Sequence, residues 1–325
     1  MDHENIKKEA LFNEVKGSLF EYLVASGLAK DSGLELEFQR SLDANYLTVL
    51  SQQDRLIRQY YPEMQSFLRD CAAISQKALK ELIPSDLSRI QLTGKLSNSP
   101  LARTWAEADL ILEGEKSSLP ISLKLNKRNS YVNTKSGGVK SFFSTYFPFA
   151  TGGIQEAFNQ KVDLEFEAMA HELHQLFDLP YGGDFKLWVR EGYSELPGEI
   201  GEEGRKVLKA YYARLARLMQ KNFEQIQLSN PDALRDALAQ VMGFGSRELI
   251  QLVCFHDFKG NASVQSSVHQ YSDLEKNLRG LRLLPFSETA SVDWEVGDWR
   301  LQIRIKPMNK FTTTAIKINC SVKFS

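Results

Sequence analysis

The sequence has 325 residues, of which 42% are hydrophobic and 25% charged, and a formal net charge of −1. Such a chain is long enough to bury a core of its own, which excludes a disulfide-dependent mini-protein and a mainly disordered chain. No run of about 18 apolar residues predicts a membrane-spanning helix, and no apolar segment of the kind secretion requires follows the N-terminus. With only three cysteines, far apart, we expect reduced, mostly buried thiols in a cytoplasmic protein.

The spacing of apolar residues predicts helices first, then a small sheet, more helices and finally strands. The expected helices cover 9–30, 43–83 (in two pieces broken near Pro62), 153–178, 202–228, 231–242 and 246–256. The expected strands cover 89–96, 107–113, 119–126, 299–306 and 312–324, with a glycine-bearing loop at 133–139. This order predicts an α+β fold with helical insertions and a C-terminal β-hairpin, divided into domains 1–150 and 151–325.

The distribution of charge is less even than its total. No acidic residue occurs between Glu115 and Glu156, nor from Trp299 to Ser325, and these two stretches hold 12 of the 40 basic residues. A basic face on an acidic body suits a polyanion, most often the phosphates of nucleic acid. Chance clustering of lysines on a solvated surface is the alternative.

The most informative segment is the hairpin predicted from the strands 107–113 and 119–126. Alternation along a strand directs Leu123 and its apolar neighbours to one face, and Ser122 and Lys124 to the other. On the first strand the same rule assigns Ala108 to the core with the leucines and directs Asp109 to the polar face. Asp109 and Lys124 are therefore expected to converge at one end of the hairpin.

A carboxylate beside a lysine on neighbouring strands is what metal-assisted phosphodiester hydrolysis requires. Asp109 would bind Mg²⁺, which polarises the scissile phosphate and lowers the pKa of a bound water. Lys124 would stabilise the attacking hydroxide or the charge that develops on phosphorus. One carboxylate is a poor Mg²⁺ site, so we expect Glu21 on the first helix to be the second acidic ligand and the carbonyl of Leu123 to add an oxygen. Glu113 is the other carboxylate nearby.

Asp109 followed by Ser122-Leu123-Lys124 resembles the PD-(D/E)xK nuclease superfamily, especially type II restriction endonucleases. The segment 16–22, which contains Glu21, is similar to the G-x-x-F-E-Y helix that supplies an acidic residue in several of those enzymes. The stretch 122–126 resembles their S-x-K-x-N variant. In this chain Ala108 stands where the motif has proline, and Ser122 occupies the position of its second acid.

The resemblance covers residues 9–30 and 89–150, under a third of the chain. It implies a restriction-endonuclease-like αβββαβ core within 1–150, Mg²⁺ dependence and cleavage of double-stranded DNA by a homodimer. It also implies catalytic roles for Glu21, Asp109, Ser122 and Lys124. The helical region and C-terminal strands of 151–325 would complete the DNA-binding face. One alternative is a non-catalytic DNA-binding protein that keeps the nuclease fold. The other is that the segment is an ordinary amphipathic hairpin, in which Asp109 and Lys124 form only a surface salt bridge.

Residues with suitable side chains for DNA contacts lie in the basic stretches. The expected set is Asn126, Lys127, Arg128, Lys135, Lys140, Arg300, Arg304, Lys306 and Lys310. The loop 133–139 could be a backbone nest for phosphate or a plain turn. The strand 299–306 could follow a DNA backbone or be a solvated edge strand. For the aromatic residues of 142–149 we favour core packing over base stacking.

The segment 171–174 (His-Glu-Leu-His) suggests a second metal chemistry. The zinc-protease motif needs histidines four positions apart on a helix, whereas His171 and His174 are three apart. The helix is better explained as amphipathic, with both histidines on a polar stripe beside Glu167 and Asp178. A histidine-based metal hydrolase remains the less favoured alternative.

Overall fold

The computed structural model describes residues 3–93, 105–150, 153–193, 200–256, 264–306 and 313–324. The chain forms two compact units, one built from Met1–Val132 with Phe244–Leu274 and the other from Asn133–Gly243 with Glu275–Ser325. Helices and two β-sheets occur together, so the α+β class is confirmed. The expected boundary at residue 150 differs from this division, because the chain leaves the first unit after Val132 and returns to it at Phe244.

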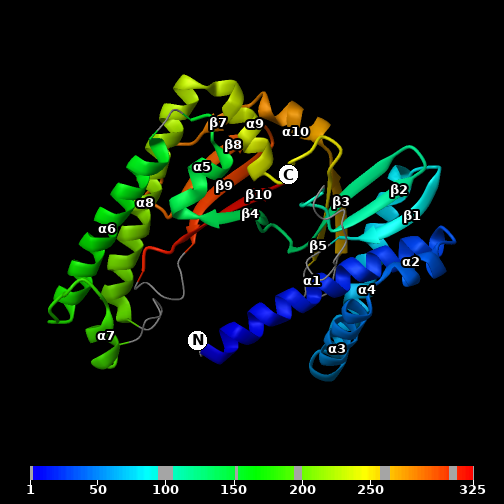
Figure 1. The fold of residues 1–325 in the computed structure, drawn as a ribbon, viewed down its shortest axis with the longest axis horizontal. Helices are drawn as coiled ribbons and strands as arrows, with labels where there is room; N and C mark the ends of the chain where they lie inside the picture. Colours follow the sequence, from blue (N-terminus) through cyan, green and yellow to red (C-terminus); the bar gives the residue numbers. More distant parts are fainter. Residues whose placement is uncertain are drawn as a thin grey trace. The chain divides into compact units, whose positions relative to one another are not determined.

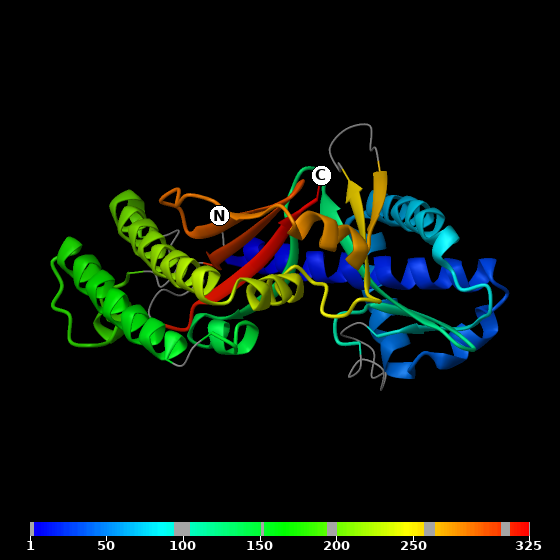
Figure 2. The same cartoon turned by 90° about the horizontal axis from the view of Figure 1, so that it is seen from above.

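The first unit combines four N-terminal helices with a five-stranded sheet (Figures 1 and 2). The helices are α1 (His3–Asp31), α2 (Glu35–Ser41), α3 (Ala44–Tyr60) and α4 (Pro62–Leu79), followed by a 3₁₀ turn (Lys80–Leu82). The strands are β1 (Leu87–Leu92), β2 (Leu110–Gly114), β3 (Ser118–Lys127), β5 (Ile250–His256) and β6 (Val264–His269). The expected break at Pro62 is confirmed, since a proline fits the first turn of a helix but not its interior.

The sheet of the first unit has the strand order β1-β2-β3-β5-β6. β3 pairs antiparallel with β2, where Leu110 is opposite Ile121, and parallel with β5, where Leu123 is opposite Leu252. These four side chains belong to one hydrophobic cluster with Phe20 of α1 and other buried residues of α1 and α4. The helices therefore cover the face of the sheet to which the apolar residues of β3 point.

The segment 246–256, expected to be helical, contains β5 instead, and that prediction was wrong. Residues 250–254 of β5 are all buried, including Gln251. A strand that is buried on both faces has no polar alternation, so its short apolar run cannot be distinguished from a buried helix by period alone. The strands at 264–269, 281–283 and 291–296 were not predicted either.

The second unit places helices against a second five-stranded sheet of order β4-β10-β9-β8-β7. Its strands are β4 (Val132–Gly138), β7 (Leu281–Leu283), β8 (Ser291–Val296), β9 (Trp299–Lys306) and β10 (Lys317–Lys323). Its helices are α5 (Phe142–Tyr146), α6 (Ile154–Leu176), α7 (Lys186–Arg190), α8 (Gly201–Ser229) and α9 (Pro231–Val241), with a 3₁₀ turn at Val139–Ser141. α10 (Tyr271–Leu278) spans the boundary between the units. The antiparallel pairing of β9 with β10 confirms the C-terminal hairpin.

Aromatic side chains form much of the core of the second unit. The ring of Phe143 lies 5.2 Å from that of Phe158 and 5.4 Å from that of Phe223, which in turn lies 5.5 Å from Trp294 of β8. Phe147 packs against the same rings. These contacts confirm that the aromatic segment 142–149 serves packing.

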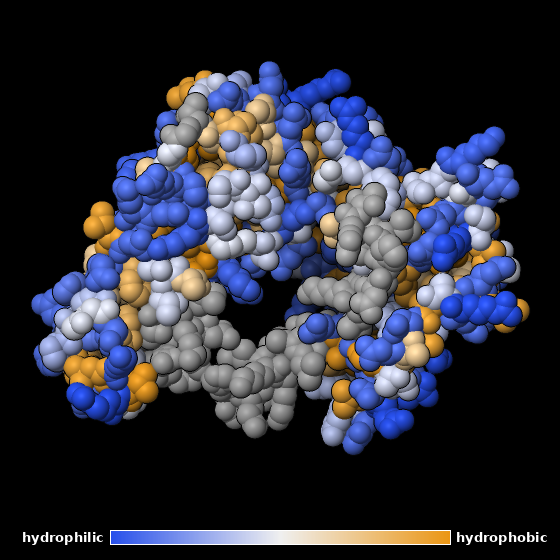
Figure 3. Space-filling view, in the orientation of Figure 1, coloured by the Kyte–Doolittle hydropathy of each residue, from blue (hydrophilic) through white to orange (hydrophobic). Residues whose placement is uncertain are grey.

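The surface visible in Figure 3 is mainly hydrophilic, as the ordinary fractions of charged and hydrophobic residues led us to expect. Figure 3 shows hydrophilic side chains over most of the visible face, with hydrophobic residues in small scattered groups. None of the helices in the described ranges has the length and apolarity that crossing a bilayer requires. Cys71, Cys254 and Cys320 are free and buried, as predicted.

His269, at the end of β6, should make the first unit sensitive to acid. Its side chain is buried and its Nε2 lies 2.8 Å from Ser267 Oγ, and burial lowers its pKa to about 4, with Asp273 opposing the shift. The unfolded chain binds this proton below about pH 6.5 and the folded one only near pH 4, so stability falls as pH drops through that window by up to about 3 kcal/mol. Urea unfolding of wild type and His269→Gln between pH 4 and 7 should show a smaller acid loss in the variant. An equal fall in the free energy of unfolding of both proteins would show that other groups cause the acid sensitivity.

Candidate functional site

The candidate site lies at the junction of β2 and β3. Asp109, directly before β2, accepts three hydrogen bonds on the same oxygen, Oδ2. The donors are the backbone N–H of Leu123 at 2.8 Å, the Oγ of Ser122 at 3.2 Å and the Nζ of Lys124 at 3.3 Å. The sequence therefore predicted correctly that Asp109 and Lys124 converge.

Strand pairing explains this convergence. The N–H of Asp109 donates to the carbonyl of Ile121, the ladder partner of Leu110, and so places Asp109 beside Ser122, the next residue of β3. Because Ile121 and Leu123 point into the core, Ser122 and Lys124 point to the opposite face. Ala108 was expected to join that core, and this prediction was wrong. It packs instead in a separate small cluster with Ile111, Leu249 and Trp105.

The environment of the pair is half-buried. The side chain of Asp109 is 18% exposed, that of Lys124 is 30% exposed, and Ser122 is buried. Partial burial strengthens the attraction between the two charges while one side of the site stays open to solvent. All three bonds are accepted by Oδ2, and none of the other described residues donates a hydrogen bond to Oδ1.

The expected second carboxylate, Glu21, lies on a half-buried part of α1. Its charge is one reason for the raised pKa of Tyr46 on α3, after burial of that phenol, so Glu21 is close to the α1–α3 contact. Glu113 accepts a hydrogen bond of 2.7 Å from Gln91 of β1. Among the described residues, no group of three or more His, Cys, Asp or Glu side chains is placed so that it could hold a metal ion. Glu21, Glu113 and Asp109 thus do not form one three-carboxylate site.

The oxygen chemistry of the site nevertheless suits a hard divalent cation. Mg²⁺ keeps several waters and takes one or two carboxylates together with substrate phosphates, so it does not need an all-protein cage. Within the part of the chain that the structure describes, no side chain or backbone N–H donates to Oδ1 of Asp109, so this is the oxygen that could bind such a cation. Leu123 pairs with Leu252 in the sheet, and its N–H donates a hydrogen bond to Asp109.

Three of the residues expected to bind DNA follow Lys124 at the end of β3. The amide of Asn126 donates to the carbonyl of Ser130 at 3.2 Å and so stabilises the turn after the strand. Lys127 is exposed, and the N–H of Arg128 donates to the carbonyl of His256. Asn126 is thus partly committed to structure, whereas Lys127 presents its charge to solvent.

The basic residues of 133–140 lie differently from the prediction. The expected glycine-bearing loop is the strand β4, which pairs with β10, so the nest and the plain turn were both wrong. Val132 is the only apolar and the only buried residue of β4, an edge strand, so the segment gave little apolar signal. Lys135 is half-buried on β4, and the ammonium of Lys140 makes a 2.6 Å ion pair with Asp163 of α6.

The strand predicted at 299–306 is confirmed as β9, and exposed and buried residues alternate along it. Arg300, Arg304 and Lys306 are exposed, while the residues between them, except Gln302, are buried. β9 lies between β8 and β10, so the alternative of an edge strand was wrong. Lys310 lies outside the described residues.

The histidine pair of α6 lies in two different environments. His171 is exposed, whereas His174 is buried among the rings of Tyr181, Phe185 and Trp188, and its Nδ1 lies 2.7 Å from the carbonyl of Ala170. The prediction of a common polar stripe was therefore wrong for His174. Aromatic packing against α7 and the segment before it explains its burial.

Comparison with known proteins adds no assignment. No family model matches the chain, and no curated protein and no solved structure matches it. The function is therefore argued from the geometry of the site.

The hydrogen bonds to Asp109 should contribute to the stability of the first unit whether or not the site is catalytic. Asp109→Ala leaves the N–H of Leu123 without its acceptor and should reduce the free energy of unfolding by about 2 kcal/mol. Asp109→Asn retains an amide oxygen and should cost about 1 kcal/mol. Urea unfolding measures both, with the exposed Asp70→Ala of α4 as control, expected within about 0.5 kcal/mol of wild type. Equal stability of Asp109→Ala and wild type would contradict this account.

Proposed function

We propose that the protein is a Mg²⁺-dependent endonuclease that hydrolyses phosphodiester bonds of double-stranded DNA, of the type II restriction class. The observation that carries the proposal is the clustering of Asp109, Ser122 and Lys124 on one face of the β2–β3 hairpin. A carboxylate whose Oδ1 accepts no hydrogen bond from the other described residues, next to an ammonium group, can bind a metal and a phosphate at the same place.

The order of the strands supports the same proposal. In the first unit three antiparallel strands are followed by one that is parallel to the third, which is the strand pattern of an αβββαβ core. α1 packs on this sheet through the common core. The second helix of that pattern is not in the first unit, because residues 133–243 between β3 and β5 belong to the second. The nuclease core proposed here thus has its fourth strand at β5.

Each residue of the site would have a distinct role. Asp109 would bind the metal through Oδ1, with Glu21 as the proposed second carboxylate and the carbonyl of Leu123 as a further oxygen. When bound, the metal would polarise the scissile phosphate and supply a hydroxide. Lys124, held by Asp109 in the free protein, would neutralise charge on the phosphate. Ser122 would keep the Asp109 carboxylate oriented by its hydrogen bond.

The basic side chains support DNA as the substrate. Lys127 and Arg128 on the first unit, and Arg300, Arg304 and Lys306 on the second, would contact phosphates or base edges. Palindromic targets would favour a homodimer with two-fold symmetry.

One observation favours the alternative of a non-catalytic DNA-binding protein with the same fold. Oδ2 of Asp109 accepts hydrogen bonds from three donors of its own hairpin, and among the described residues no group of three His, Cys, Asp or Glu side chains could hold a metal ion. A purely structural ion pair would look the same. Cleavage assays separate the two functions, because only the nuclease loses activity together with the ion pair.

Supercoiled plasmid incubated with Mg²⁺ should be cut into discrete fragments and left intact with EDTA. Asp109→Ala and Lys124→Ala should each lower the cutting rate by about 100-fold or more, because each removes charge stabilisation of the transition state. Asp70→Ala and the exposed Lys116→Ala, at the opposite end of the hairpin, are matched controls and should cut normally. Uncut plasmid at high enzyme concentration, or full activity of both site variants, would overturn the proposal.

The role of Glu21 is testable by a Mg²⁺ titration. Glu21→Gln removes the charge of the proposed second ligand and should raise the Mg²⁺ concentration for half-maximal cutting about tenfold or more, as loss of a ligand charge weakens cation binding. Glu14→Gln alters an exposed carboxylate of the same helix and should leave the titration unchanged. If the two variants behave alike, another carboxylate completes the site.

A further inference from the structure

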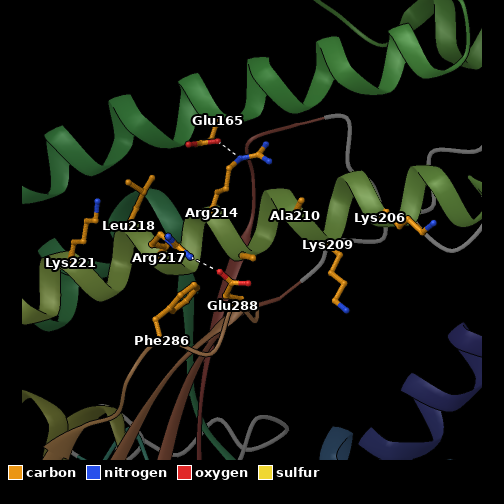
Figure 4. Close-up of a pocket in the computed structure, with 11 residues that line it drawn as sticks. Glu165, Lys206, Lys209, Ala210, Arg214, Arg217, Leu218, Lys221, Phe286 and Glu288 are labelled. Atoms are coloured by element: carbon orange, nitrogen blue, oxygen red, sulfur yellow. Dashed lines mark hydrogen bonds and ion pairs between the residues drawn. The ribbon is translucent and has the colours of Figure 1, made fainter.

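The second unit contains a cavity that the proposed active site does not use. It has a volume of about 610 Å³ and is lined by α8, by Glu165 of α6, and by Phe286 and Glu288 from the segment between β7 and β8 (Figure 4). Five of the lining residues are basic and two are acidic: Lys206, Lys209, Arg214, Arg217, Lys221, Glu165 and Glu288. The cavity is therefore basic as a whole.

The two arginines of the cavity are held in place. The Nε of Arg214 bonds to Glu165 at 2.5 Å, and an Nη of Arg217 bonds to Glu288 at 2.9 Å. The guanidinium of Arg217 also lies 5.1 Å from the centre of the Phe286 ring, within reach of a cation–π interaction. Each ion pair uses one of the five N–H donors of its guanidinium, so the others can bind an anion in a geometry that is already fixed.

The two lysines at 209 and 221 carry the uncompensated charge. Both are exposed, and neither has an ion pair with another of the described residues. Figure 4 shows their side chains extending from α8 on either side of the arginines. Lys206 is paired with Glu203 at 2.7 Å and contributes less net charge.

The row of cations has the length and spacing to follow a polymer. From Lys206 to Lys221 a helix rises about 22 Å, and neighbouring cations are about 5 to 8 Å apart along its axis. One DNA strand presents a phosphate about every 3.4 Å along its axis, so such a row can meet about every second phosphate. A single small anion would use only a part of it.

We propose that the α8 groove is a second DNA-binding surface, which takes the phosphate backbone of duplex DNA without reading its sequence. The inference rests on the proposed function for the choice of DNA over other polyanions. Arg214 and Arg217 would orient the backbone, and Lys209 and Lys221 would supply the counterion-releasing contacts. The groove would hold DNA whether or not the metal site is loaded.

The test uses fluorescence anisotropy of the full-length protein with a 30-base-pair duplex in EDTA, over a range of salt. For Lys209→Ala/Lys221→Ala we expect a loss of affinity of about tenfold or more and a salt slope shallower by about two, because each phosphate contact contributes about 0.9. Lys209→Arg/Lys221→Arg should bind as wild type. Lys161→Ala/Lys276→Ala removes the same charge from exposed positions of the second unit outside the groove, and should change affinity less than twofold.

The outcomes distinguish this inference from the proposed function. Wild-type affinity and salt slope in the Lys209→Ala/Lys221→Ala variant would overturn the α8 surface while plasmid cutting could still stand. α8-dependent binding without any Mg²⁺-dependent cutting would support the surface and overturn the nuclease. No duplex binding by wild type at low salt would overturn the surface. Displacement of the duplex by millimolar inorganic phosphate, or tighter binding of a polyglutamate peptide, would assign the groove to those anions instead.

Discussion

The central position of β3 determines both the core of the first unit and its candidate site. β3 pairs with β2 on one side and with β5 on the other, so its backbone direction and register are fixed along nearly its whole length. One face of the strand must then supply the core, through Ile121 and Leu123, while the other carries Ser122 and Lys124. The geometry at Asp109 follows from that register, since a slip of one residue would exchange the two faces.

This constraint explains why the hairpin could be predicted from the sequence. Alternating apolar and polar residues determine the faces of β3 without reference to the rest of the chain, and the short turn brings Asp109 beside Ser122. The break at Pro62 and the packing of the phenylalanines near 142–149 were predictable for similar local reasons. Glu21 was harder to place, because its neighbours depend on how α1 packs against α3, and no local pattern reports that packing.

Other elements depend on tertiary partners that the sequence does not display. β5 is buried over residues 250–254, so its polar residue Gln251 carries no signal of alternation. β4 is recognisable as a strand only through its partner β10. The basic residues of α8 were not predicted to form a site, because acidic residues such as Glu202, Glu203 and Glu224 on the same helix balance the charge of the segment. In the folded helix the basic residues between positions 206 and 221 line the cavity, whereas these three acidic residues do not.

The division of the first unit has a consequence for how the chain is made. β5 is synthesised roughly 120 residues after β3, which at about 5–20 residues per second corresponds to a delay of about 6–25 seconds. During that interval the nascent sheet ends at β3, whose unpaired edge is a site for pairing with other chains. Completion of this sheet is a late, long-range event. The helices α1–α4 are synthesised before β5 and pack on the apolar face of the sheet, so they can shield that face on the ribosome.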